Sequence, residues 1–176
     1  MMSDFLGPLE LIGGRWAIGD PKRKRRSHLV LTAEGMEHHK DGAAEPRAVI
    51  PWGRFMGLGV NATTRAWMAT RAGGVLELAS TSAQIGGRSA CSASATLRHP
   101  YENWSVNYTH HERAYTGSHV FLLDRLIGQV SDAKALHRLG DPDWLGAAVA
   151  ELAPFRVRWA ATAVRRVREV VEDLGT

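Results

Sequence analysis

Cysteine is nearly absent from this chain of 176 residues, which contains Cys91 alone. A single thiol excludes an internal disulfide and favours a reducing compartment such as the cytoplasm. Residues 1–12 contain Asp4 and Glu10 but no basic residue, so they do not resemble a secretory signal. We therefore expect a cytoplasmic protein.

Long apolar runs are also missing. The strongly apolar stretches, such as residues 120–123 and 146–149, are far shorter than the roughly 20 residues that a membrane-spanning helix needs. Apolar residues nevertheless make up 44% of the chain and charged residues 23%, which excludes wholesale disorder and predicts a folded core. We expect no transmembrane helix, and peripheral association with a membrane stays open.

Lysine is scarce, so the net charge of +4 rests mainly on arginine. The lysines are Lys22, Lys24, Lys40 and Lys134. A basic balance permits anionic partners, although arginine-rich composition can equally follow from a GC-rich genome. Charge alone therefore identifies no partner.

The first two thirds of the chain have the short alternating apolar runs and glycine turns of antiparallel β-structure. Gly73-Gly74 suits a tight hairpin between residues 63–72 and 75–80, because glycine readily adopts positive φ. Gly13-Gly14 and Gly86-Gly87 are typical of turns and lack the neighbours of a phosphate-binding loop. The predicted strands are residues 9–18, 27–39 with a turn at Glu34-Gly35, 47–60 interrupted by Pro51, 65–70, 74–80, 92–99 and 103–109.

After Tyr115 the apolar period lengthens to that of helices. Asp141-Pro142 is the strongest boundary, because an aspartate N-cap precedes a proline at the first helical position. The predicted helices are residues 119–129 capped by Ser118, a short one from 131 or 132 to 140, 144–153 ending at Pro154, and 155–174.

The last predicted helix carries a narrow apolar seam. The seam could pack on the chain's own body, which we favour, or zip against a second copy to form a homodimer. Its residues are Val157, Ala160, Val164, Val167, Val171 and Leu174.

Residues 21–52 resemble the opening of a pleckstrin-homology domain of the bacterial type. They contain a basic first hairpin, a strand ending in Leu31-Thr-x-x-Gly35, a polar hairpin, and Ile50-Pro51-Trp52 before the strand at 55–60. The resemblance covers roughly residues 8–130. It implies an α+β fold: a seven-stranded antiparallel β-sandwich or partly open barrel, capped by the helix at 119–129. The predicted organisation is thus a β domain over residues 1–130 and a helical extension over 131–176.

In lipid-binding members of that family, basic side chains of the first hairpin hold phosphates. The matching cations here are adjacent, and by charge alone they would attract lipid headgroups, RNA or DNA, or form only a solvated loop. They are Lys22, Arg23, Lys24, Arg25 and Arg26.

Catalytic and cofactor motifs are lacking. Cys91 has no neighbouring histidine and is expected to be a packed thiol. The histidine pairs 38–39 and 110–111 could bind zinc only if the fold brought them together, with Glu112 as a further candidate ligand, because adjacent strand residues face opposite ways. We expect these histidines to be exposed and predict no metal site. The six tryptophans are expected to anchor the core and interfaces.

The sequence therefore predicts a non-enzymatic binding or scaffolding module without cofactor, acting through a protein partner or an anionic membrane. Two alternatives stay open: a nucleic-acid-binding accessory protein that uses the basic loop, and a metal-dependent hydrolase that uses His38, His39, His110 and His111.

Overall fold

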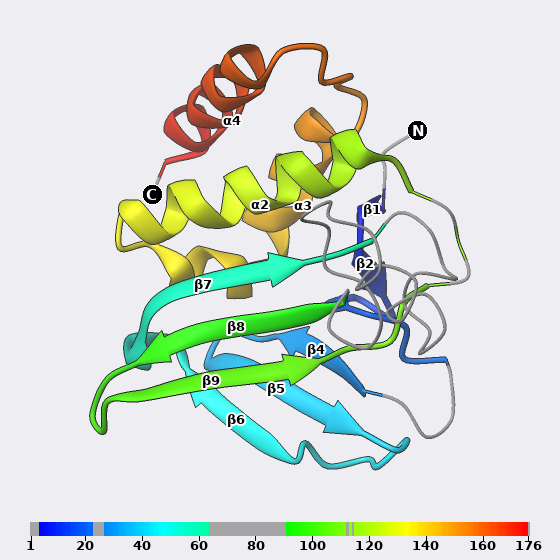
Figure 1. Cartoon of the computed structure of the whole chain (residues 1–176), viewed down its shortest axis with the longest axis vertical. Helices are drawn as coiled ribbons and strands as arrows, with labels where there is room; N and C mark the ends of the chain where they lie inside the picture. Colours follow the sequence, from blue (N-terminus) through cyan, green and yellow to red (C-terminus); the bar gives the residue numbers. More distant parts are fainter. Residues whose placement is uncertain (1–3, 23–26, 64–90, 112, 114, 176) are drawn as a thin grey trace, which may run out of the picture.

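The computed structural model describes residues 4–22, 27–63, 91–111, 113 and 115–175. Within these ranges the chain forms two antiparallel sheets and then three α-helices (Figure 1). The predicted mixed α+β fold, with antiparallel strands before helices, is confirmed at this level. Over the described residues the sheets contain six and three strands and do not close into a barrel, so the predicted seven-stranded sandwich is matched only roughly.

The first sheet is a meander in which every strand pairs with its chain neighbours. Gly13 and Gly14, at φ of 59° and 79°, turn the chain inside the single strand predicted over residues 9–18, so that prediction is wrong and the predicted glycine turn is confirmed. The strands are β1 Phe5–Leu6, β2 Leu9–Ile12, β3 Arg15–Ile18, β4 Ser27–Leu31, β5 Gly35–Lys40 and β6 Ala48–Pro51.

The second sheet follows a short 3₁₀ turn, η1 (Trp52–Arg54). It consists of β7 (Phe55–Asn61), β8 (Ser92–Leu97) and β9 (Glu102–Asn107) in that order. Its inner face buries alternate residues of β8, as the two-residue period of a strand requires. The strands predicted over 65–70 and 74–80, the Gly73-Gly74 hairpin and the Gly86-Gly87 turn lie outside the described residues.

Helix α2 (Gly117–Asp132) runs alongside β7, with its apolar face in the core (Figure 1). Its N-cap is Thr116, whose side chain accepts a hydrogen bond from the His119 backbone, rather than the predicted Ser118. Ser118 Oγ instead accepts a bond from the Val157 backbone N–H, at 3.1 Å. The sequence does not reveal this difference because the two hydroxyls are adjacent and the Val157 partner is remote.

Two further elements follow α2. The short predicted helix is a 3₁₀ turn, η4 (Leu136–Gly140). Helix α3 (Pro142–Leu152) begins as predicted, since the Asp141 carboxylate accepts from the backbone N–H groups of residues 143 and 144. Trp16 Nε1 donates to the Pro142 carbonyl oxygen at 3.2 Å, which ties α3 to the first sheet.

Helix α4 is Ala160–Leu174 and packs on α2 and α3. It starts five residues later than predicted, because Trp159 is extended and Val157 is held by Ser118 outside the helix. The face that α4 buries also differs from the predicted seam. Within the seam, Val167 and Val171 are buried, Val157, Val164 and Leu174 are half-buried, and Ala160 is exposed; the helix also buries Ala163 and Val170.

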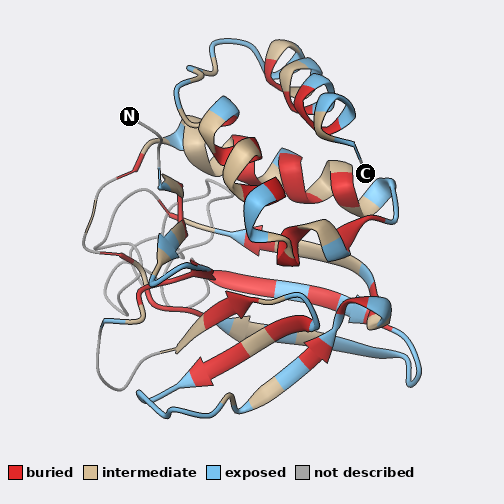
Figure 2. Cartoon of the chain, turned by 180° about the vertical axis from the view of Figure 1, so that it is seen from behind, coloured by how far each residue is buried: buried red, intermediate tan, exposed pale blue. Residues whose placement is uncertain are grey.

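One hydrophobic cluster joins both sheets and all three described helices (Figure 2). Trp16, Trp52 and Trp144 are buried in it, Trp104 packs at its margin, and Trp159 is 75% exposed. Trp67 lies outside the described residues. No helix in the described part of the chain combines the length and apolarity that crossing a bilayer requires.

Candidate functional site

A pocket of about 540 Å³ opens where the start of β4 and β6 and the ends of β5 and β9 meet. We call it the basic pocket. It is lined by Ser27, His38, Lys40, Arg47, Ala48, Trp104, Ser105, Val106 and Asn107.

Lys40 and Arg47 give the basic pocket its charge. They stand at the two ends of the hairpin between β5 and β6, which is closed by a 2.7 Å hydrogen bond from the Arg47 backbone N–H to the His38 carbonyl oxygen. The exposed Asp41 and Glu45 of the same hairpin do not line the pocket. The lining is therefore cationic, with hydroxyl and amide groups that can also hydrogen-bond an anion.

His38 forms part of the floor and is 9% exposed. Its Nε2 lies 2.7 Å from Ser27 Oγ. Burial lowers the pKa of His38, and the neighbouring Arg47, Lys40 and His39 lower it further. The ring is consequently neutral at neutral pH and leaves the two cations as the pocket's charge.

Thr109 fixes both ends of the basic segment beside this pocket. Its carbonyl oxygen accepts a bond from the Asp20 backbone at 3.0 Å, and its backbone N–H donates to the Ser27 carbonyl oxygen at 2.8 Å. Of the predicted phosphate-binding residues, Lys22 is exposed, whereas Arg23, Lys24, Arg25 and Arg26 lie outside the described residues. Ser27, where the chain re-enters the sheet as β4, lines the basic pocket.

The histidine pairs were predicted to be exposed, and the structure shows that they are not. His38, His39 and His111 are buried, and His110 is half-buried. His39 stacks on His28, with ring centroids 5.1 Å apart, and its Nε2 lies 2.8 Å from Glu37 Oε2. Glu37 lies two residues before His39 on β5, whereas the stacking partner His28 lies on β4, and the sequence gives no sign of that contact.

The second histidine pair contacts backbone carbonyl oxygens. His110 Nε2 lies 2.8 Å from the Thr63 oxygen, and His111 Nε2 lies 3.0 Å from the Pro8 oxygen. Across the described ranges, no three histidine, cysteine, aspartate or glutamate side chains form a group that could hold a metal ion. Glu112 lies outside those ranges.

Cys91 is a packed thiol, as predicted. It is 2% exposed, and burial raises its pKa, which disfavours the nucleophilic thiolate. The described surroundings therefore suit packing rather than covalent chemistry.

Sequence reasoning missed Lys40, Arg47 and Trp104 as site residues. Lys40 and Arg47 are seven positions apart around a polar hairpin, a spacing that could have suggested juxtaposed strand ends. Trp104 reaches the pocket from β9, for which no local signal exists. Comparison of the chain with models of known protein families, with curated proteins and with solved structures gave no match.

Proposed function

We propose that this protein is a binding module that docks on anionic membranes through the basic pocket and the adjoining segment Lys22–Arg26. The observation that carries the proposal is that Thr109 bonds to the backbones of Asp20 and Ser27, which flank this basic segment in the sequence, and that Ser27 lines a pocket with Lys40 and Arg47. Seven cations would then act on one surface.

The order of the elements supports a pleckstrin-homology-like organisation for the module. Strands β3–β6 form a four-stranded meander, β7–β9 form a second sheet, and α2 follows as the capping helix. In this interpretation β1 and β2 are an N-terminal addition to a seven-stranded framework. The basic segment then occupies the first hairpin, between β3 and β4.

Electrostatics gives the expected strength. Each lysine or arginine near an anionic surface contributes on the order of 1 kcal/mol, and the attraction decays within a Debye length of about 8 Å at physiological salt. Seven such residues are sufficient for salt-sensitive binding without a deep headgroup site. Lipid headgroup specificity would come from the hydrogen-bonding groups of the pocket, such as Ser27 and Asn107.

Vesicle co-sedimentation tests the proposal. The full chain should sediment with vesicles of phosphatidylcholine plus phosphatidylserine and much less with phosphatidylcholine alone. Lys40→Glu combined with Arg47→Glu should weaken binding at least about tenfold, because two favourable charges become repulsive. A matched control is Arg158→Glu with Arg168→Glu, which makes the same change in net charge at exposed positions of the linker and α4.

Equal loss in both double variants would assign binding to overall charge and overturn the basic pocket as the site. Absence of vesicle binding by the wild type, with salt-dependent binding to single-stranded RNA or duplex DNA, would replace the proposal with the nucleic-acid alternative. Binding to neither would leave a protein partner as the predicted ligand.

A further inference from the structure

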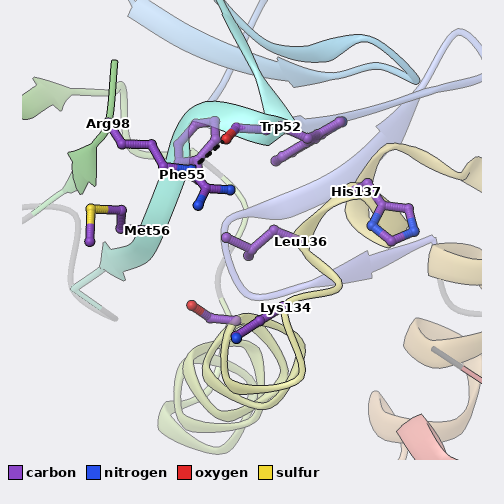
Figure 3. Close-up of a pocket in the computed structure, with 9 residues that line it drawn as sticks. Trp52, Phe55, Met56, Arg98, Lys134, Leu136 and His137 are labelled. Carbon is purple, nitrogen blue, oxygen red and sulfur yellow. Dashed lines mark hydrogen bonds between the residues drawn. The ribbon is translucent and has the colours of Figure 1, made fainter. Parts of the chain in front are cut away.

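A second pocket, of about 450 Å³, lies at the opposite end of β6 from the basic pocket (Figure 3). It is bounded by η1 and the start of β7 on one side and by the C-terminal end of α2 and η4 on the other. We call it the α2-end pocket. Its lining residues are Trp52, Gly53, Phe55, Met56, Arg98, Ser131, Lys134, Leu136 and His137.

The walls of the α2-end pocket are held in place before any ligand arrives. Trp52 Nε1 donates to the Thr32 carbonyl oxygen at 2.8 Å, which fixes the indole. Gly140, at the end of η4, packs so closely on Thr32 that a Cβ there would lie 2.0 Å from the same carbonyl oxygen. This contact docks η4, and with it Leu136 and His137, against the first sheet.

Two neighbouring arginines differ in what they bind. Arg54 is occupied, because its guanidinium donates to the Arg98 and Pro100 carbonyl oxygens and to Glu102 at 2.7 Å. Arg98 donates through Nε to the Gly53 carbonyl oxygen at 2.9 Å, and its two Nη atoms bond to no residue in the described part of the chain. Arg98 is thus oriented by one bond while both terminal nitrogens stay available.

Lys134 brings a second cation from the other wall (Figure 3). Its backbone adopts φ of 57° after the end of α2, and its ammonium forms no ion pair or hydrogen bond within the described ranges. Among the residues that the structure describes, no carboxylate lines the pocket. Phe55, Met56 and Leu136 also line the pocket, so it combines apolar side chains with two cations.

We propose that the α2-end pocket binds a small amphipathic anion: an aromatic or short aliphatic body carrying a carboxylate or sulfonate. A volume of about 450 Å³ falls in the range of small-molecule sites. The apolar body packs between Trp52, Met56 and Leu136, and the anionic group bonds to the Nη atoms of Arg98. The proposal does not depend on membrane docking, since the two pockets share no residue.

Arg98 should contribute more than Lys134. The C-terminal end of a helix carries partial negative charge, which disfavours an anion placed beside it. Lys134 therefore offsets the partial negative charge at the end of α2, whereas Arg98 approaches the anion from the side of the sheet.

Anilinonaphthalene sulfonate is a suitable probe, because it pairs an aromatic body with an anionic group and fluoresces when bound. Arg98→Ala should weaken its affinity about tenfold and Lys134→Glu measurably less, in proportion to the charged hydrogen bonds lost. Octanoate should displace it if aliphatic carboxylates fit equally well. Arg168→Ala, on the exposed face of α4, is the control and should leave binding unchanged.

Methyl NMR of labelled methionine locates the binding. The Met56 signal, assigned by its loss in Met56→Leu, should shift on addition of the probe, while buried Met36 should not. Probe binding that Arg98→Ala and Lys134→Glu both leave unchanged, or a Met56 signal that does not move, would overturn the proposal. Lys134→Glu removes no described hydrogen bond of its side chain, so it keeps the test valid if Arg98→Ala perturbs folding.

Discussion

Gly140 shows how one missing side chain permits an element to dock. A Cβ at this position would come within 2.0 Å of the Thr32 carbonyl oxygen and 2.8 Å of its carbon, both backbone atoms that cannot swing aside. We predict that Gly140→Ala lowers the free energy of unfolding by about 1–3 kcal/mol, the usual cost of overpacking. Urea denaturation measures the change.

Gly128 supplies the matched control for Gly140→Ala. It lies within α2, and a Cβ there would meet nothing within 4 Å. Gly128→Ala should therefore stabilise the protein by up to about 1 kcal/mol, because alanine is the better helix former. Equal effects at the two positions would contradict the close packing of η4 on Thr32.

Individual residues were predictable where the signal is local. Asp141 caps α3 and Gly13-Gly14 turn the chain because the chemistry of each is contained in two or three adjacent positions. The burial of His38 was not predictable, because its ring bonds to Ser27 on another strand. A polar residue is accepted in a core when such a partner exists, and the sequence does not show which residues will meet.

Helix α4 is held by a face that includes Val167, which is 1% exposed against α2 and α3. We predict that Val167→Asp costs on the order of 3 kcal/mol or more, because it buries an unpaired carboxylate. The melting temperature should drop by the same amount at low and high protein concentration, since the contact lies within one chain.

Ala160 is the control within the same predicted seam. It is exposed at the first position of α4, where an added carboxylate faces the positive end of the helix dipole. Ala160→Asp should leave the melting temperature unchanged or slightly raised. A change in mass by light scattering with an unaltered melting temperature for Val167→Asp would instead support the homodimer through this helix.

Most described elements were predictable from the sequence, but the residues at which they begin and end were less predictable. Strand β6, which ends at Pro51, and the following β7 can be predicted from alternation and turn residues, as can the start of α3. The start of α4 does not, because it depends on a hydrogen bond between Val157 and Ser118, 39 residues away. The basic pocket is harder still to predict, since four strands must meet before Lys40 and Trp104 share a surface.

The molecule as a whole buries neutral histidines, and its stability should depend on pH for that reason. Burial is the largest cause of the lowered pKa of His28, His38, His111 and His119. In the unfolded chain these rings return toward 6.5. Between the folded and unfolded pKa values the unfolded state binds more protons, so the free energy of unfolding should fall as pH falls below about 6.5.

Urea denaturation at about pH 7.5 and about pH 5.5 measures this dependence. Each proton taken up on unfolding changes the free energy of unfolding by about 1.4 kcal/mol per pH unit. The four histidine rings set the upper limit of this contribution. Histidine ring NMR in the folded protein should show the same four residues titrating below 6.5. A stability that stays constant or increases toward pH 5.5 would contradict the prediction.

The hydrophobic core extends to both sides of residue 130, where the sequence predicts a division into two domains, and that division stays a prediction. Leu126 of α2, Leu145 of α3 and Val167 of α4 belong to the same cluster as residues of both sheets. The helices are thus part of one continuous interior in the described chain.

Strand β6 separates the two pockets by four residues, Ala48–Pro51, or roughly 13 Å at the usual rise of a strand. The two pockets share no lining residue, and energetic effects at sites so far apart usually add independently. Under the two proposals above, a membrane bound at one end of β6 would leave the α2-end pocket at the other end. Membrane attachment and capture of a small anion could then be varied separately.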